Sequence, residues 1–180
     1  MANLSKFILN KIMGWKVINT FPEVPKCVLA VAPHTSNWDF VVGKLAYNSL
    51  GRQANFLIKE EWFFFPFNLF FGSIGGIPVK RGKSGSLTDI LSKEFQTREW
   101  MHLGITPEGT RKPVKEWKKG FYFIAVKAKV PILLIGLDYG KKEARVLDLF
   151  YPTNDYRKDI VTIKSYYKDI QARKPENFIL

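Results

Sequence analysis

The chain of 180 residues contains a single cysteine, Cys27, which excludes a disulfide bond within the molecule. Its first residues lack the charged, apolar and cleavage regions of a secretory signal, so we expect a cytoplasmic protein. No repeat, low-complexity tract or linker divides the sequence, and a hydrophobic content of 46% excludes a disordered chain. These features predict a single domain over residues 21–180, preceded by a helix over residues 1–20.

Acidic residues are scarce as well. The chain has 16 of them against 28 lysines and arginines, which gives a net charge of +12. A charge of this size predicts attraction to an anionic partner, either nucleic acid or a membrane surface. The aromatic residues cluster between residues 61 and 79 instead of alternating with lysines, as a base-stacking platform requires. The sequence therefore favours an anionic membrane surface over nucleic acid.

Apolar runs alternate with helical patterns along the chain, which is typical of an α/β fold with a mixed, mostly parallel β-sheet flanked by helices. The expected strands cover residues 26–32, 54–59, 77–80, 102–106, 132–137 and 145–149. The expected helices cover residues 37–50, 87–100, 120–129 and 159–172. Polar motifs follow the first and the fourth strand, and they meet at one edge of the sheet if these strands are parallel neighbours.

The first of these motifs is HTSNWD, which places His34 five residues before Asp39. Histidine takes up a proton near neutral pH, so His34 can act as a general base toward a hydroxyl group. Asp39 can hold the other ring nitrogen and stabilise the imidazolium ion. On an uninterrupted helix the two residues would lie about 140° apart, so a turn must separate them. No serine or cysteine with a nucleophile signature accompanies the pair, which indicates direct activation of an external hydroxyl.

The second motif, PEGTR, follows the fourth strand and runs from Glu108 to Arg111 after its proline. Arg111 can bind phosphate oxygens through its planar guanidinium group, and Arg81, which follows the third strand, can do the same. Glu108 can hold an arginine or bond an acceptor hydroxyl. Gly109 allows a close approach of the backbone, and Thr110 can cap a turn.

The order of four sequence blocks resembles the glycerolipid acyltransferase family, which includes the 1-acylglycerol-3-phosphate acyltransferases. His34 and Asp39 match the H-x4-D block of that family, and GGIPVKR, which ends at Arg81, matches its second block. PEGTR matches the E-G-T-R block, and the WKKGF segment with Lys119 resembles the lysine-glycine segment that usually follows it. The fourth block is matched by VPILLIG over residues 130–136.

The resemblance implies transfer of a fatty acyl group from a coenzyme A or acyl carrier protein thioester to the hydroxyl of a lysophosphatidic-acid-like acceptor. His34 would be the base and Asp39 its orienting partner, with no covalent enzyme intermediate, no metal and no further cofactor. Backbone amides after His34 could bind the developing oxyanion. The residues that the resemblance assigns to substrate binding are Arg81, Glu108, Gly109, Thr110, Arg111 and Lys119.

Two apolar segments predict a peripheral position at the inner face of the membrane. Residues 62–79 carry no charge for 18 residues, but their prolines and glycines argue against a continuous spanning helix. We expect a half-buried interfacial segment or an apolar wall for the acyl chain, with an internal helix and loop as the alternative. At the N-terminus, an amphipathic helix with an apolar stripe within about 140° can anchor the domain or pack against it. The stripe consists of Leu4, Phe7, Ile8, Ile12 and Trp15.

Three alternatives remain open. The acceptor could be another lyso-phospholipid or an amino-acid-derived lipid, since Pro78 stands where family members commonly have a bulky or aromatic residue. The chain could instead be a catalytically inactive lipid-binding protein at the membrane surface. A nucleic-acid-binding module has support from the net charge but none from the motifs.

Overall fold

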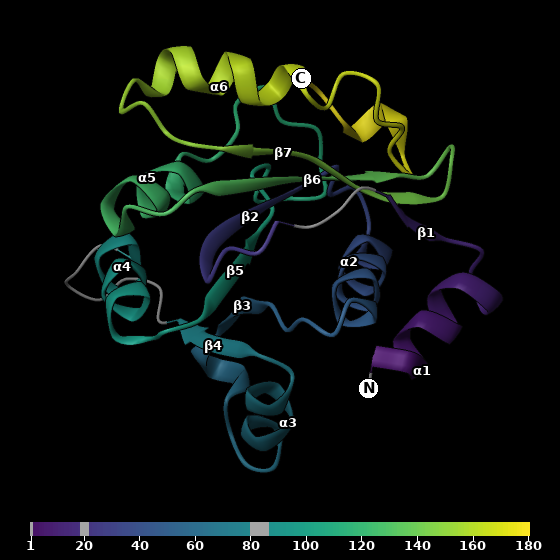
Figure 1. Ribbon diagram of the computed structural model, residues 1–180, viewed down its shortest axis with the longest axis horizontal. Coiled ribbons are helices and arrows are strands. Elements are labelled where there is room, and N and C mark those ends of the chain that lie inside the picture. The colour runs from purple at the N-terminus through teal and green to yellow at the C-terminus, as the bar shows by residue number, and fades with distance from the viewer. Residues whose placement is uncertain (1, 19–21, 80–86) are drawn as a thin grey trace.

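A computed structural model describes residues 2–18, 22–79 and 87–180 (Figure 1). The described residues form a seven-stranded sheet in the order β1-β7-β6-β2-β5-β3-β4. The strands are β1 (Lys16–Ile18), β2 (Lys26–Ala32), β3 (Asn55–Lys59), β4 (Gly76–Val79), β5 (Met101–Ile105), β6 (Ile132–Asp138) and β7 (Glu143–Phe150). Every neighbouring pair is parallel except β6 and β7, so the expected mixed, mostly parallel sheet is confirmed.

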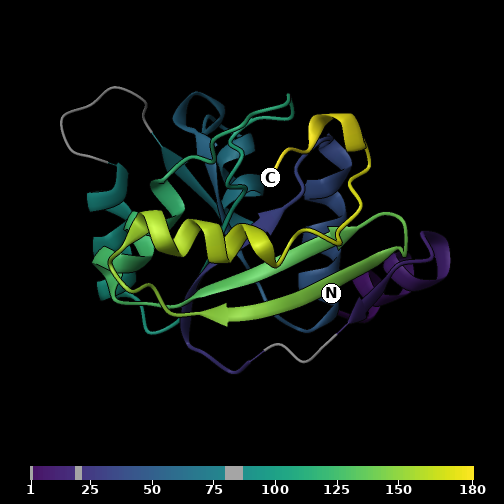
Figure 2. The same ribbon diagram turned by 90° about the horizontal axis from the view of Figure 1, so that it is seen from above.

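Helices cover both faces of the sheet. The longer helices are α1 (Ala2–Phe7), α2 (Asn37–Ser49), α3 (Phe67–Ser73), α4 (Leu87–Thr97), α5 (Gly120–Ala128) and α6 (Tyr156–Ser165). The short helical turns are η1 (Ile8–Ile12), η2 (Glu60–Trp62) and η3 (Pro175–Asn177). In Figure 2, α6 lies across the β6–β7 pair. The result is a layered α/β domain in which the central strands are screened from solvent.

Two hydrophobic clusters fill the space between the sheet and the helices. One joins the sheet to α4, α5 and α6 and contains the fully buried rings of Phe95, Phe121 and Tyr167. The other joins the opposite face to α2 and the N-terminal helix and contains Leu9 and Tyr47. Strand β6 is buried along its whole length because it contributes to both clusters. This explains its continuous apolar sequence, which is typical of a central strand.

The structure corrects the expected ends of the chain. The predicted helix over residues 1–20 is wrong in length, because helical structure ends at Ile12 and residues 16–18 form strand β1 beside β7. Gly14 makes the change of direction possible with a positive φ of 72°. The helix predicted over residues 159–172 begins at Tyr156, where the Asp155 side chain caps it, and ends at Ser165.

The uncharged segment over residues 62–79 contains a turn, the short helix α3 and strand β4, so the expected interruption of its helix is confirmed. Within the described ranges, no helix is long and apolar enough to cross a membrane. The part of the segment around α3 protrudes from the sheet at the bottom of Figure 1. Its side chains are far more exposed than an internal helix would allow, with Phe65 exposed by 78% and Leu69 by 66%.

Candidate active site

His34 and Asp39 lie where β2 leads into α2. Strand β2 ends at Ala32, and Ser36 caps α2 by accepting a hydrogen bond from the Trp38 amide. The Asp39 side chain completes a capping box with the Ser36 backbone, so it lies in the first helical turn below the His34 loop. The turn that the spacing of His34 and Asp39 predicts is therefore present.

The Asp39 carboxylate is buried and accepts several hydrogen bonds. The Thr35 and Ser36 amides donate to Oδ2 at 2.6 and 2.7 Å, and the Ser36 hydroxyl donates to Oδ1 at 3.1 Å. The Tyr139 hydroxyl donates to Oδ1 at 2.6 Å. Since the Thr35 and Ser36 amides are bound to Asp39, these two amides are not free to hold an oxyanion.

The imidazole of His34 lies beside this carboxylate without bonding to it. Nδ1 of His34 is 3.7 Å from Oδ2 of Asp39, and among the described residues Nδ1 has no hydrogen-bond partner. Burial lowers the pKa of His34, while the nearby Asp39 raises it and Arg111 lowers it. The net effect favours a neutral imidazole near neutral pH, which is the form that accepts a proton.

Glu108 connects the two motifs through the backbone. Its Oε1 accepts the His34 amide at 2.8 Å, and Oε2 has no hydrogen-bond partner among the described residues. Burial raises the pKa of Glu108 to about 7. Strands β2 and β5 are parallel neighbours, which brings both motifs to one edge of the sheet as expected. Glu108 bonds the His34 loop, whereas the sequence suggested an arginine or an acceptor hydroxyl as its partner.

Of the other predicted residues, Arg111 lines the cavity, whereas Thr110 and Lys119 do not. Arg111 is exposed, donates a hydrogen bond to the Asn37 side chain and lies on the cavity wall with His34. Thr110 caps a turn by accepting the Lys112 amide at 3.2 Å, as predicted. Lys119 lies away from the cavity wall, with its ammonium group 5.2 Å from the centre of the Tyr156 ring.

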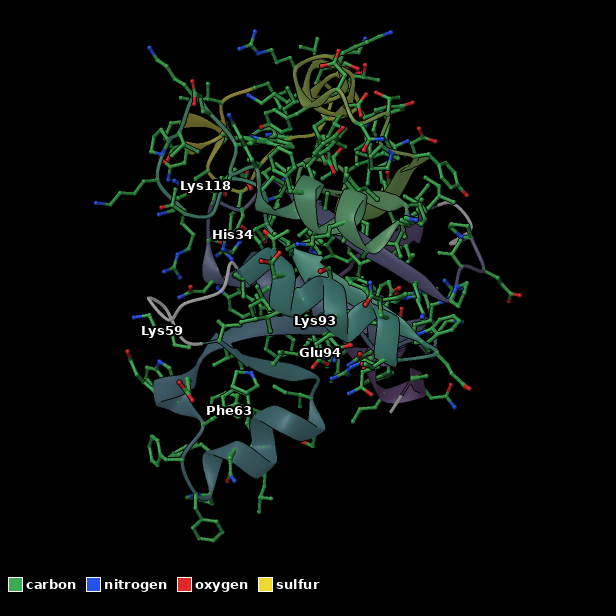
Figure 3. The ribbon with its side chains drawn as sticks, turned by 90° about the vertical axis from the view of Figure 1, so that its left-hand side faces the viewer. His34, Lys59, Phe63, Lys93, Glu94 and Lys118 are labelled. Carbon is green, nitrogen blue, oxygen red and sulfur yellow. The ribbon has the colours of Figure 1, made fainter. Side chains whose placement is uncertain are left out.

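The last two predicted residues are Gly109 and Arg81. Gly109 has a positive φ of 65°, and a Cβ atom there would come within 2.8 Å of Cγ of Lys118. The backbone therefore approaches this side chain closely, as the glycine suggested. Arg81 lies outside the described residues. In Figure 3, His34 lies at the edge of the sheet, with Lys118 above it and Phe63 below.

A cavity of about 600 Å³ opens beside His34, between α2 and the sheet. Its polar lining includes His34, Asp39 and Arg111 at the carboxyl ends of β2 and β5. Lys44 also lines it, with Nζ donating to the Ile74 carbonyl at 2.5 Å, and burial lowers its pKa. The apolar lining consists of Leu29, Val31, Phe40, Val41, Gly43, Ala54, Phe56, Leu57, Gly104, Ile105 and Ile135. Such a cavity can hold an apolar chain with a polar group at His34.

The site also includes residues that the sequence did not indicate. Tyr139 follows β6 and reaches Asp39 from a position 100 residues away in the chain. Lys174, near the C-terminus, donates its amide to the Thr35 hydroxyl at 3.2 Å. Neither residue belongs to a recognisable motif, so the sequence contains no signal that would have identified them.

Three comparisons with known proteins bear on this site. A family model described as Acyltransferase matches residues 17–137. Among solved structures, the chain is similar to the crystal structure of the 1-acyl-sn-glycerophosphate (LPA) acyltransferase PlsC from Thermotoga maritima, with a TM-score of 0.59 and 17% identity. That match covers 93% of this chain and 78% of the other, and at this identity it supports the fold. No curated protein sequence matches the chain.

Proposed function

Because this chain belongs to the acyltransferase family, we propose that it transfers a fatty acyl group from a thioester to the hydroxyl of a lysophosphatidic-acid-like acceptor. The observation that supports this most directly is the position of His34 beside buried Asp39 on the wall of a largely apolar cavity. The acyltransferase with a similar fold acts, by its title, on a 1-acyl-sn-glycerophosphate. That similarity favours the same class of acceptor here.

In the proposed reaction, the neutral His34 accepts the proton of the acceptor hydroxyl through Nε2. The hydroxyl oxygen then forms a bond to the thioester carbonyl carbon. When the tetrahedral intermediate collapses, the carbon–sulfur bond breaks and the imidazolium ion returns the proton to the thiolate. Asp39 stabilises the imidazolium ion across 3.7 Å, a separation that can shorten when substrate is bound.

The other parts of the site supply binding. The apolar walls of the cavity suit the acyl chain, and burial of each methylene group contributes about 0.8 kcal/mol. The exposed guanidinium of Arg111 suits the acceptor's phosphate, to which it can donate a pair of hydrogen bonds. Either coenzyme A or acyl carrier protein can present the thioester, and no metal or further cofactor takes part in the scheme.

We also propose an anionic membrane as the surface on which the enzyme works, at its inner face. The net charge of +12 favours anionic lipid, and the exposed aromatic side chains of the protruding segment can enter the headgroup region. These side chains are Trp62, Phe64, Phe65, Phe67 and Phe70, and the aliphatic side chain of Leu69 is exposed beside them. The N-terminal helix adds the exposed side chains of Leu4, Phe7 and Ile12.

The experiment that tests the reaction measures free thiol released from palmitoyl coenzyme A in mixed micelles. Wild-type protein is compared with His34→Ala, each with and without 1-acylglycerol-3-phosphate. We expect acceptor-dependent release that is lost in the variant, whose melting temperature verifies that it is folded. Equal acceptor-dependent release from both proteins would exclude His34 as the base. Vesicle binding without release from any thioester or lyso-lipid acceptor would instead indicate an inactive lipid-binding protein.

A further inference from the structure

The C-terminal segment, residues 171–174, lies against the loop that bears His34. The Lys174 amide donates to the Thr35 hydroxyl at 3.2 Å, and the Gln171 carbonyl accepts the Tyr139 amide at 2.8 Å. This segment, drawn in yellow, lies above α2 in Figure 1 and beside it in Figure 2. A stretch of chain outside the recognised motifs is therefore attached both to the His34 loop and to Tyr139, which follows β6.

Arg173 strengthens this attachment through two aromatic rings. Its guanidinium carbon lies 5.4 Å from the centre of the Trp38 ring and 6.0 Å from the centre of the Tyr139 ring. Trp38 belongs to the first turn of α2, and Tyr139 directly follows β6. Both distances suit an attraction between a cation and the face of an aromatic ring. Arg173 therefore connects the sheet to the helix that carries Asp39.

Tyr139 is the point at which this connection reaches the catalytic pair. Its hydroxyl donates to Oδ1 of Asp39 at 2.6 Å, and its ring packs edge-on against Trp15 with 4.8 Å between ring centres. The other acceptor sites of Asp39 are filled by the Thr35 amide and by the amide and hydroxyl of Ser36. As a result, Asp39 is fixed beside the imidazole of His34 but does not bond to it.

We propose that Tyr139 is a positioning residue, held by the C-terminal segment, that fixes the Asp39 carboxylate and limits how strongly it binds the His34 imidazole. The proposal rests on the proposed function, because it assigns Tyr139 and Arg173 a role in the action of His34 as a base. The charged side chains beside the imidazole are Asp39 from α2 and Arg111 from the loop after β5. Glu108, from the same loop, accepts the His34 amide, and burial raises its pKa to about 7.

The physical reason lies in the charge of the carboxylate. A hydrogen bond donated to Asp39 stabilises its negative charge and leaves less of it to attract a proton on His34. When the Tyr139 hydroxyl is removed, Oδ1 keeps only the longer bond from the Ser36 hydroxyl, at 3.1 Å, and the carboxylate can turn toward Nδ1. The imidazolium form of His34 is then favoured, so the base is lost to protonation at a higher pH than in the wild type.

The test compares Tyr139→Phe with Tyr122→Phe in the full chain. Tyr122 is a matched control, since its buried hydroxyl donates to Asp159 at 2.7 Å and its ring belongs to the cluster on the other face of the sheet from the one that Tyr139 joins. Proton NMR follows the pH titration of His34 in the free protein, and thiol release gives the pH dependence of transfer. We expect both midpoints to rise by roughly 0.5 to 1 pH in Tyr139→Phe and to stay in place in Tyr122→Phe.

The role of the C-terminal segment is tested at Arg173, which is exposed and can be replaced without disturbing the core. Arg173→Gln removes the cation and should raise the His34 midpoint in the same direction, whereas Arg173→Lys keeps a cation and should restore it. Lys164→Gln is the matched control, because Lys164 also lies over a ring, 5.6 Å from the centre of Trp117. It should leave the midpoint unchanged.

The titration needs no turnover, so it separates this proposal from the proposed function. If the wild type transfers no acyl group, the proposed function fails, while the His34 midpoints still decide the role of Tyr139. Identical midpoints in wild type, Tyr139→Phe and Arg173→Gln would overturn the proposal. A midpoint shift in Tyr139→Phe with none in Arg173→Gln would overturn the part assigned to the C-terminal segment.

Discussion

Glu108 keeps a carboxyl group in the interior of the protein, where its side chain is 3% exposed. One oxygen holds the His34 amide, and the other has no hydrogen-bond partner in the described part of the chain. An ionised carboxylate with an unsatisfied oxygen is costly in such a place. The fold tolerates it because the bond to the His34 amide fixes the loop that carries His34.

Glu108→Gln should therefore stabilise the protein at alkaline pH. The folded state holds the proton of Glu108 up to about pH 7, whereas the unfolded chain releases it near 4.5, so the free energy of unfolding falls as pH rises between these values. Glutamine stays neutral and still accepts the His34 amide. Denaturant unfolding at pH 5 and pH 8 should show the variant gaining about 2 kcal/mol over wild type between the two. A difference that does not change with pH would contradict this account.

Arg111 offers a second test at the residue scale, because its guanidinium is exposed and bound to the Asn37 side chain on the cavity wall. Loss of a charged hydrogen-bonding pair to phosphate should raise the KM for 1-acylglycerol-3-phosphate in Arg111→Ala by about tenfold to a hundredfold. Lys112→Ala, a charge change next to it, is the control and should have little effect. Monoacylglycerol has no phosphate, so its KM should stay the same. An unchanged KM for the phosphate acceptor would favour another lyso-lipid.

At the scale of the elements, strand β5 contains a glycine through which the cavity can be narrowed by substitution. Gly104 lies on the cavity wall, and a Cβ atom there would meet the Asn55 carbonyl oxygen at an ordinary 3.5 Å. Alanine therefore fits at this position, whereas leucine must extend into the space proposed for the acyl chain. The two substitutions form a graded pair on one strand.

Gly104→Leu should shift the donor preference toward short chains. If the leucine displaces two methylene groups at about 0.8 kcal/mol each, kcat/KM for palmitoyl relative to octanoyl coenzyme A falls by about tenfold. Gly104→Ala should keep the wild-type ratio. Thiol release with the two donors gives this ratio for each protein. An unchanged ratio in the leucine variant would show that the acyl chain binds elsewhere.

The sequence predicts the elements whose signals are local. The apolar run of β2 and the polar HTSNWD turn after it are enough to place His34 on a loop and Asp39 in the first turn of α2. Strand β1 has three residues and forms through pairing with β7, so its own sequence carries little sign of it. The helix α6 ends at Ser165, and after it the hydroxyl of Tyr167 bonds the Ala30 carbonyl in the core.

In the site, too, residues in local motifs are predictable from the sequence, whereas contacts that depend on side-chain direction or on distant segments are not. His34 and Arg111 belong to motifs that end parallel neighbouring strands, so their proximity follows from the order of the elements. The bond from Glu108 to the His34 backbone depends on the direction of one side chain, which spacing does not determine. Tyr139 meets Asp39 because β6 lies beside β2, a pairing that joins distant parts of the chain.

At the scale of the whole molecule, exposed apolar side chains are concentrated on the protruding segment around α3. Phe65 and Phe70 are exposed by 78% and 58%. In Figure 1 this segment lies at the bottom of the molecule and α6 lies at the top. Val161 on α6 is exposed by 69%, so it provides an apolar control on the opposite side.

The proposed membrane surface predicts that two forces add in vesicle binding. The net charge of +12 attracts anionic lipid and is screened by salt, whereas insertion of aromatic side chains is not. Sedimentation with phosphatidylglycerol vesicles should therefore show that wild-type binding becomes weaker at high salt but does not disappear. The double variant Phe65→Ser and Phe70→Ser should lose the binding that resists salt. At low salt it should bind at least tenfold more weakly than the wild type, since burial of each ring contributes about 1.5–3 kcal/mol.

Val161→Ser should bind vesicles as the wild type does, because α6 faces away from the proposed surface. Light scattering of the same proteins distinguishes lipid from a second copy of the chain as the occupant of the aromatic face. If the double variant turns a wild-type dimer into a monomer and keeps full vesicle binding, the face serves self-association. If the double variant keeps the oligomeric state of the wild type and loses vesicle binding, the aromatic side chains are in contact with lipid. That contact then explains why residues 62–79 carry no charge.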